Sequence, residues 1–404
     1  MELGPIWRAM MRNKTSYILI ALQIAVTMAI MVNAIGIIQD RSEQMARPSG
    51  IDEQNIFYLA SLVYDPNLDA KAVISEDLDA IRHFPGVRDA IVSNTVPLSD
   101  SGWSEGLKLH PDPDADATGV ALYFSDEHGL DTFGLNLIAG RNFDPTEPTW
   151  LDIGSDQWPP LAILTKAMVE ELFPDMPPAE AVGKTVYIRD TKPVKIIGVT
   201  ERMQAPWNNW PGVERSMLVP WKRADNFSRY VIRAEPGYRD EIMPKIEELL
   251  ASRGEGRIVR DMQTMEATRH RSYLDDSGMV TLLVFIVGLL TAITGLGIVG
   301  LASFTVARRT KQIGTRRALG ATRMAILRYF MLENFLVSTV GVVGGAIIAV
   351  AINVWLVEAF DIRRIAWYLI PAAMVTLWLV GQAAVYGPAR RATRVSPAMA
   401  TRSV

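Results

Sequence analysis

The organisation of this 404-residue chain is clearest in residues 306–327, which read Val306-Ala-Arg-Arg-Thr-Lys-Gln-Ile-Gly-Thr-Arg-Arg-Ala-Leu-Gly-Ala-Thr-Arg-Met-Ala-Ile-Leu327. The segment 307–328 carries seven basic residues and no acidic residue. Apolar Ile313, Leu319 and Ile326 are interleaved with these cations, which predicts a short amphipathic helix at a membrane surface. By charge alone, the cations equally fit simple anchors for the ends of flanking membrane helices.

Four apolar stretches, almost free of charge, lie around this basic segment. They are residues 17–38, 279–306, 329–357 and 365–386. With a helical rise of about 1.5 Å per residue, each can cross a hydrocarbon core about 30 Å thick. The sequence therefore predicts four transmembrane helices. The first is longer than the apolar region of a cleavable signal, about 7–15 residues, so we expect it to be retained.

The distribution of basic residues predicts the orientation of these helices. Cations are concentrated in residues 1–16, 307–328 and 387–404, which the positive-inside rule assigns to the cytoplasm as N-terminal segment, loop and tail. Residues 39–276 are predominantly acidic and are then extracytoplasmic. The chain contains no cysteine, so we expect this outer segment to be held by its own core.

The outer segment 39–276 mixes strand-like and helix-like patterns. Short β-branched or aromatic runs bounded by Gly, Pro or Asp alternate with helical spacing in residues 75–83, 166–173 and 240–252. This mixture predicts a large α+β domain in two lobes, inserted between the first and second transmembrane helices.

The chain offers little that predicts catalysis. Residues 178–185 end in Gly183-Lys184-Thr185, but Pro178 stands where a phosphate-binding loop needs its first glycine. The four histidines lack the spacing of metal ligands, and no Gly-x-Ser-x-Gly nucleophile motif is present. We expect a non-catalytic subunit without a metal or another cofactor, and no nucleic-acid partner.

The order of residues in the basic segment resembles the FtsX-like permease family, whose loop reads roughly Arg-x-x-Glu-Ile-Gly-x-x-Arg-Ala-Leu-Gly-Ala. Matching positions are Arg308, Ile313, Gly314, Arg317, Ala318, Leu319, Gly320 and Ala321, while Gln312 replaces the usual acidic residue. Glu333, Gly341, Gly344 and Gly345 match the helix that follows. Residues 133–143, 182–186 and 388–397 are similar to MacB-type exporter permeases.

The resemblance implies a permease subunit of an ABC-type export or mechanotransmission complex in the bacterial inner membrane, surrounded by lipid. A separate cytoplasmic ATPase would bind ATP and Mg²⁺, and its motion would reach the periplasmic domain and expel substrates from the periplasm. Expected partners are that ATPase, a second permease subunit in a homodimer or heterodimer, and a periplasmic adaptor with an outer-membrane duct. The alternative is an FtsX-like regulator that activates a periplasmic cell-wall hydrolase or signalling partner without transporting cargo.

Three groups of residues are predicted to carry this function. The resemblance implies ATPase coupling by Arg308, Ile313, Gly314, Arg316, Arg317, Ala318, Leu319, Gly320 and Ala321. Small residues predict helix packing or dimer contacts at Gly295, Gly341, Gly344 and Gly345, and Glu333 is expected to pair with Arg328 or Arg317 near the inner interface. Trp207, Trp210, Met217 and Trp221 are predicted either as core or as an outer contact for cargo or partner.

Overall fold

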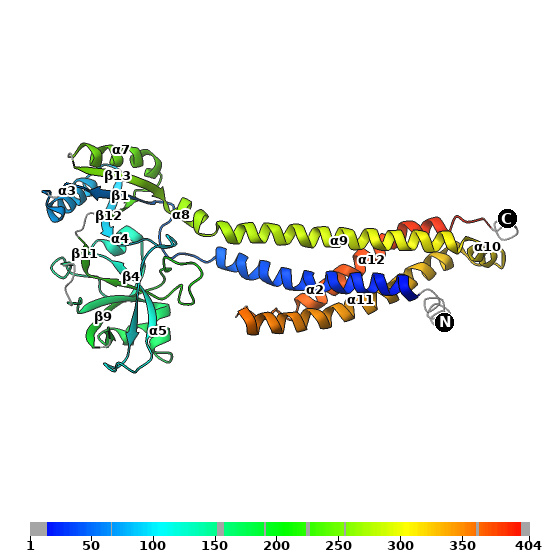
Figure 1. Cartoon of the computed structure of the whole chain (residues 1–404). Coiled ribbons are helices and arrows are strands. Elements are labelled where there is room, and N and C mark those ends of the chain that lie inside the picture. Colours follow the sequence, from blue (N-terminus) through cyan, green and yellow to red (C-terminus); the bar gives the residue numbers. More distant parts are fainter. Residues whose placement is uncertain are drawn as a thin grey trace. The chain divides into compact units, whose positions relative to one another are not determined.

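The computed structural model describes residues 14–65, 67–151, 157–189, 191–223, 227–253, 256–360 and 363–396. The chain forms two compact units. One runs from Ala46 to Asp275, and the other combines the chain up to Met45 with the chain from Asp276 onward. Figure 1 labels some of the elements of both, and each unit is described by itself.

The second unit is helical. Its elements are α2 (Lys14–Met45), α9 (Leu274–Arg308), α10 (Thr310–Ala318), α11 (Arg323–Phe360) and α12 (Leu369–Ala392). Among the described residues, all of these except α10 are long and apolar enough to cross a membrane.

The helix ends differ from the predicted ones in two informative places. Helix α2 continues to Met45, so residues 39–45, predicted in the outer domain, extend the first membrane helix. Helix α12 begins at Leu369 rather than at residue 365. Pro371 explains the later start, because proline is tolerated in the first helical turn, where backbone N–H groups have no intrahelical partner.

Helices α2, α11 and α12 pack along one another and bury an apolar seam. This seam includes Ile24 and Met28 of α2, Val337 and Val342 of α11, and Leu377 of α12. Helix α9 is buried at few positions and leaves large apolar side chains such as Leu282, Phe285 and Leu296 exposed. In a bilayer such side chains meet lipid or another transmembrane helix.

The outer unit contains two main β-sheets. The smaller is antiparallel, with the order β13-β1-β12-β2. Helices α3 and α7 pack on it through an apolar cluster that includes Ile81 and Ile246. Its elements are β1 (Ile56–Val63), α3 (Ala70–Arg82), β2 (Val87–Ser93), β12 (Phe227–Ala234), α7 (Arg239–Ser252) and β13 (Arg257–Thr264), followed by α8 (Met265–Ser272).

The larger sheet is mixed, with the order β5-β9-β7-β10-β4-β3-β8. Its strands are β3 (Trp103–Lys108), β4 (Thr118–Phe124), β5 (Leu137–Gly140), β7 (Leu161–Thr165), β8 (Thr185–Ile188), β9 (Lys192–Thr200) and β10 (Ser216–Val219). Short helices α4 (Gly129–Phe133), α5 (Lys166–Leu172) and α6 (Pro178–Ala181) accompany it, and β6 (Thr149–Leu151) pairs with β11 (Trp221–Arg223).

The two main sheets share one apolar core. Ile56, Ile91 and Val231 of the smaller sheet belong to the same buried cluster as Tyr123 and Leu218 of the larger one. The two sheets are thus packed into one compact unit. The predicted fold class, a large α+β domain between the first and second of four membrane-spanning helices, is confirmed.

Candidate functional site

The basic loop, residues 307–328, folds into helix α10 and a tight turn into α11. After α10, the N–H of Gly320 donates to the carbonyl of Arg317, and the N–H of Ala321 donates to that of Arg316. Gly320 has a φ of +93°, the left-handed conformation that this helix stop requires and that glycine adopts without strain. Thr322 then caps α11 by accepting from the N–H of Ala325 at 3.2 Å.

Some of the residues predicted to couple to an ATPase are buried against neighbouring helices, and the others are exposed. Ile313 and Gly314 are buried, and Ile313 packs in the same cluster as Ile326 and Phe330 of α11. Leu319 is the most exposed large apolar side chain in the described residues, at 83%. The remaining exposed members are Arg308, Arg316, Ala318 and Gly320, with Ala321 half-buried. The loop thus presents a small basic and apolar face.

Two arginines of α10 are held by contacts within the chain. Arg317 donates from Nη1 to the carbonyl oxygens of Thr393 at 2.6 Å and Val395 at 3.4 Å, just beyond the end of α12. The guanidinium of Arg316 lies 4.8 Å from the ring centroid of Tyr329 on α11. Helix α10 is therefore tied to the inner ends of both α11 and α12.

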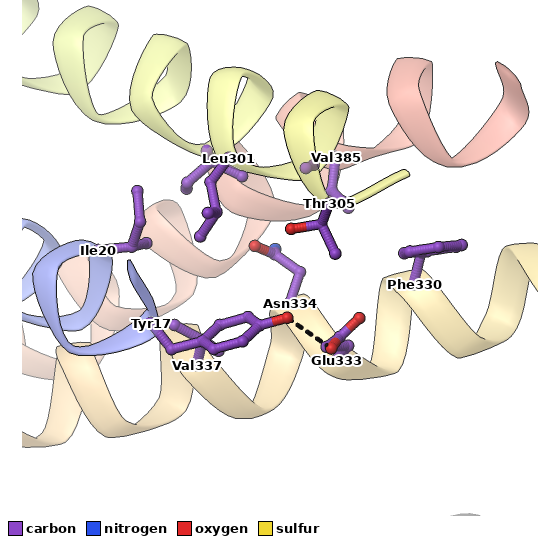
Figure 2. A pocket seen from close by; sticks show the side chains of 11 residues that line it. Tyr17, Ile20, Leu301, Thr305, Phe330, Glu333, Asn334, Val337 and Val385 are labelled. Atoms are coloured by element: carbon purple, nitrogen blue, oxygen red, sulfur yellow. Dashed lines mark hydrogen bonds between the residues drawn. The ribbon is translucent and has the colours of Figure 1, made fainter. Parts of the chain in front are cut away.

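Glu333 forms the centre of a buried polar cluster, which we call the inner clasp: Tyr17, Arg309 and Glu333. Arg309, between α9 and α10, contacts the Glu333 carboxylate at 3.0 Å. The Tyr17 hydroxyl of α2 donates to Glu333 Oε1 at 2.7 Å, and Figure 2 shows this side chain directed at the carboxylate. Helix α2, the junction between α9 and α10, and helix α11 thus meet at one carboxylate.

The predicted partner of Glu333 was wrong. Glu333 lies almost three turns into α11, since the helix begins at Arg323, and neither Arg328 nor Arg317 pairs with it. A helix that starts earlier carries the carboxylate deeper into the bundle, where the chain between α9 and α10 supplies the cation.

A small cavity lies beside the inner clasp. Tyr17, Thr305, Glu333 and Asn334 line it together with apolar side chains (Figure 2). Its volume is about 30 Å³, which exceeds the roughly 10–15 Å³ that one water molecule needs. This cavity is too small to hold a larger ligand.

The predicted packing glycines have different surroundings. A Cβ at Gly341 would lie 2.7 Å from Ile24 Cβ, and one at Gly345 would lie 2.6 Å from the carbonyl oxygen of Ala25. These two glycines allow α11 to approach α2 closely within the same chain. Gly344 has open space around it, and Gly295 makes only an ordinary contact with Val380.

The tryptophans and the methionine singled out in the outer domain also differ in burial. Met217 and Trp221 are buried in the core of the larger sheet, because β10 is a central strand and Trp221 lies just beyond it. The core alternative therefore holds for these two residues, and the outer-contact alternative is wrong for them. Trp207 and Trp210 are half-buried and pack edge to face, 5.9 Å apart.

Two family models match the chain. The MacB-like periplasmic core domain matches residues 17–249, and the FtsX-like permease C-terminal model matches residues 284–397. The chain belongs to the MacB-like and FtsX-like permeases. It is therefore an ABC transporter permease, a membrane protein with an extracytoplasmic domain, and the predicted family is confirmed.

Curated relatives of this permease are distant but extend along most of it. It is 23% identical to the pyoverdine export ATP-binding/permease protein PvdT of Pseudomonas fluorescens over 98% of the chain and 58% of the relative. It is 24% identical to the ABC transporter permease YknZ of Bacillus subtilis over 94% and 92%. It is 25% identical to the macrolide export ATP-binding/permease protein MacB of Neisseria meningitidis over 77% and 47%. The permease thus spans about half the length of the two export proteins.

A second polar clasp lies in the outer domain of the permease, and the sequence did not predict it. Arg269 of α8 binds the carboxylate of Glu53 through Nε at 2.7 Å and Nη2 at 2.8 Å. Ser49 also donates to this carboxylate. Burial of Glu53 opposes its ionisation, but the hydrogen bonds from Arg269 and Ser49 outweigh this effect and lower the pKa of Glu53. We call this pair the outer clasp.

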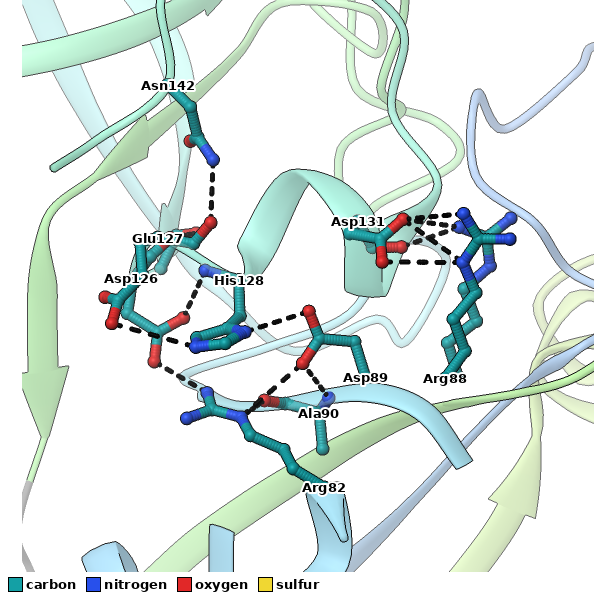
Figure 3. A network of polar contacts seen from close by, with 11 residues as sticks. Arg82, Arg88, Asp89, Ala90, Asp126, Glu127, His128, Asp131 and Asn142 are labelled. Carbon is teal, nitrogen blue, oxygen red and sulfur yellow. Dashed lines mark hydrogen bonds and ion pairs between the residues drawn. The ribbon is translucent and has the colours of Figure 1, made fainter. Parts of the chain in front are cut away.

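A further network connects the two sheets of the permease's outer domain (Figure 3). His128 Nδ1 lies 3.0 Å from Asp89 Oδ2 on β2, and Arg82 of α3 contacts Asp126 at 3.0 Å. Burial raises the pKa of Asp89, although Ala90 N–H, His128 and Arg82 act in the opposite direction. The described residues contain no group of three or more His, Asp or Glu side chains arranged to hold a metal ion.

No local signal in the sequence could have revealed these links in the permease. Glu53 and Arg269 are 216 positions apart, and Tyr17 and Glu333 are 316 positions apart. Single charged residues at such separations match no motif, and only the packed fold brings them together.

Proposed function

We propose that this permease transmits the motion of a separate cytoplasmic ABC ATPase to its outer domain, as a subunit of an export complex in the bacterial inner membrane. In this proposal the chain is non-catalytic, and ATP and Mg²⁺ bind to the ATPase. Two permease subunits work together, and the outer domains expel substrates from the periplasm through an adaptor and an outer-membrane duct. The names of the relatives PvdT and MacB, which join an ATP-binding part to a permease part, support the pairing with an ATPase.

The observation that carries the proposal is the construction of the basic loop. Its exposed face centres on Leu319, flanked by Arg316, and offers an apolar contact within a cationic rim. Buried apolar anchors surrounded by polar groups typically dominate the binding energy of protein interfaces. This face is the surface we assign to the ATPase.

The same loop has rigid attachments to the membrane helices. Arg317 fixes α10 to the end of α12, and Arg309 fixes the start of α10 to Glu333 on α11 and to Tyr17 on α2. A push on Leu319 is therefore delivered to the whole helical unit, because buried charge-assisted hydrogen bonds resist displacement.

Motion then passes along the chain into the outer domain. The backbone enters this domain at Ala46, after α2, and leaves it at Asp275, within the first turn of α9. The outer clasp joins the entering segment to the leaving segment, since Arg269 binds both the Glu53 carboxylate and the carbonyl oxygen of Arg47. A displacement of either the entering or the leaving segment consequently acts on both segments.

The test is reconstitution of the permease in nanodiscs with its cognate ATPase. We expect Leu319→Ser to weaken ATPase association and permease-dependent ATP hydrolysis about tenfold or more, as for an interface anchor. Leu109→Ser, the same exchange at an exposed leucine of the outer domain, is the matched control and should leave both unchanged. Equal behaviour of the two variants would show that the ATPase does not dock on this face.

A second experiment separates export from regulation. The permease is isolated from its native envelope with its bound partners. Co-purification of an adaptor and an outer-membrane duct is the expected result, whereas a cell-wall hydrolase in their place would establish the regulatory alternative.

A further inference from the structure

A second, larger cavity lies in the helical unit, away from the inner clasp. It has a volume of about 360 Å³, within the range of small-ligand sites, roughly 300–1,000 Å³. Helix α2 lines it from Asn33 to Glu43, α11 contributes Asn353 and Leu356, and residues 363–369 close one side. The N–H of Ile365 donates to Asn353 Oδ1 at 3.2 Å, which holds that side against α11.

Exposed aromatic residues indicate the level of this cavity in the membrane. Trp355 is 59% exposed, Trp367 is 80% exposed and Tyr368 is 48% exposed, and all three lie on or next to the elements that form the cavity. Tryptophan and tyrosine gather where lipid headgroups meet the hydrocarbon core. Because the basic loop is at the other end of α11, the cavity lies at the headgroup level of the outer leaflet.

Asn33, one of the residues that line the cavity, has a polar atom without a partner in the part of the chain that the structure describes. Asn33 is only 8% exposed, and its Nδ2 donates to the carbonyl oxygens of Ala29 at 2.9 Å and Ala349 at 3.2 Å. These two acceptors fix which end of the amide is nitrogen. Asn33 Oδ1 is then buried without a hydrogen-bond donor among the described residues, and an unpaired buried acceptor is costly.

Charges of both signs also line the cavity. Glu43 contacts Arg363 at 3.1 Å, and Asp40 accepts from Gln44 Nε2 at 2.9 Å. Arg364 lines the cavity as well, and among the described residues no carboxylate lies within ion-pair distance of it. A ligand that carried only positive or only negative charge could pair with only some of these charged side chains.

We propose that this cavity binds the headgroup of a zwitterionic aminophospholipid from the outer leaflet. Arg364 and Arg363 bind the phosphate, which guanidinium groups recognise through paired N–H donors. The ammonium group lies near the carboxylates of Asp40 and Glu43, on the side of the cavity that Asn33 also lines. The inference stands apart from the proposed function, because it requires neither an ATPase nor transport.

The experiment measures lipid binding to the full chain purified in detergent, by native mass spectrometry during titration with phosphatidylethanolamine or phosphatidylglycerol. We expect one phosphatidylethanolamine per chain to bind more tightly than phosphatidylglycerol, which has no ammonium group. Arg364→Gln should weaken phosphatidylethanolamine binding about tenfold, as expected for loss of a charge-assisted hydrogen bond. Arg390→Gln, the same exchange at an exposed arginine near the inner end of α12, should bind as the wild type does.

Two further measurements test the roles of the ammonium group and of the acyl chains. Glu43→Gln should reduce the preference for phosphatidylethanolamine over phosphatidylglycerol, since it removes a carboxylate on the ammonium side. Soluble phosphoethanolamine should displace the lipid only at much higher concentration, because the acyl chains add affinity. Any of three results would overturn the proposal. The wild type could bind the two lipids equally, the two arginine variants could have equal effects, or soluble phosphoethanolamine could displace the lipid at an equal concentration.

Discussion

Adding one methyl group to helix α11 tests how closely it packs on α2. In Gly345→Ala, the new Cβ would lie 2.6 Å from the carbonyl oxygen of Ala25 and 2.6 Å from Met28 Cβ. Ordinary contacts begin at 3.4 Å. The two helices must therefore move apart by about 0.8 Å, the difference between 3.4 and 2.6 Å, along a seam that is otherwise buried.

The expected cost follows from this overlap. Overpacking a well-filled core typically costs about 1–3 kcal/mol. At about 2 kcal/mol, the midpoint of thermal unfolding should fall by about 4–8 °C, using the scaling for domains of 150–250 residues. Replacing glycine by alanine also favours helix formation by up to about 1 kcal/mol, which partly offsets the overlap.

Gly344→Ala is the matched control. It is the neighbouring residue on the same helix and gains the same helical preference, but nothing lies within 4 Å of its added Cβ. The assay heats the full chain in detergent and measures the fraction that stays monodisperse in size-exclusion chromatography. Gly344→Ala should match or exceed the wild type, and Gly345→Ala should fall below it. If both variants lose stability equally, α11 does not approach α2 at Gly345.

Glu53→Gln should lower the midpoint of thermal unfolding at pH 7, by the equivalent of about 1.5–3 kcal/mol for a charge-assisted hydrogen bond to Arg269. Because the folded-state pKa of Glu53 is lowered, its contribution is complete above the unfolded value, about 4.3, and is lost as the pH falls further. The gap between wild type and variant in a pH series should therefore narrow progressively as the pH falls below about 4.3, and a constant gap would contradict the assignment. Arg309→Gln should cost about 3–5 kcal/mol in the same thermal assay, because it leaves the Glu333 carboxylate buried without its cation. Arg308→Gln, at the adjacent exposed residue, should stay within about 0.5 kcal/mol, and adding Glu333→Gln should restore part of the loss caused by Arg309→Gln.

The membrane topology could be predicted because its signals are local. Apolar length and the position of cations depend only on composition along the chain, so the four spans and the basic loop needed no knowledge of packing. The family resemblance at Arg317 to Ala321 could also be recognised from the sequence. The structure shows why a glycine stands at position 320, because this residue follows α10 in a left-handed conformation.

The candidate site was only partly predictable for the opposite reason. Glu333 was recognisable as an ionisable residue in a membrane helix, but its partner Arg309 depends on where α11 begins. Gly341, Gly344 and Gly345 look alike in the sequence, yet only the first and last lie against α2. Successive residues are rotated by about 100° around a helix, so the position of α2 decides which of the three glycines face it.

Sequence alone therefore determined which segments lie in the membrane, which side carries the cations and that an α+β domain stands between the first two spans. Tertiary structure alone decided the outer clasp of Glu53 with Arg269 and the cavity bordered by Asn33 and Arg364. The physical reason is that hydropathy and charge act residue by residue. A hydrogen bond or a cavity exists only when side chains from distant parts of the chain are packed within a few ångströms of each other.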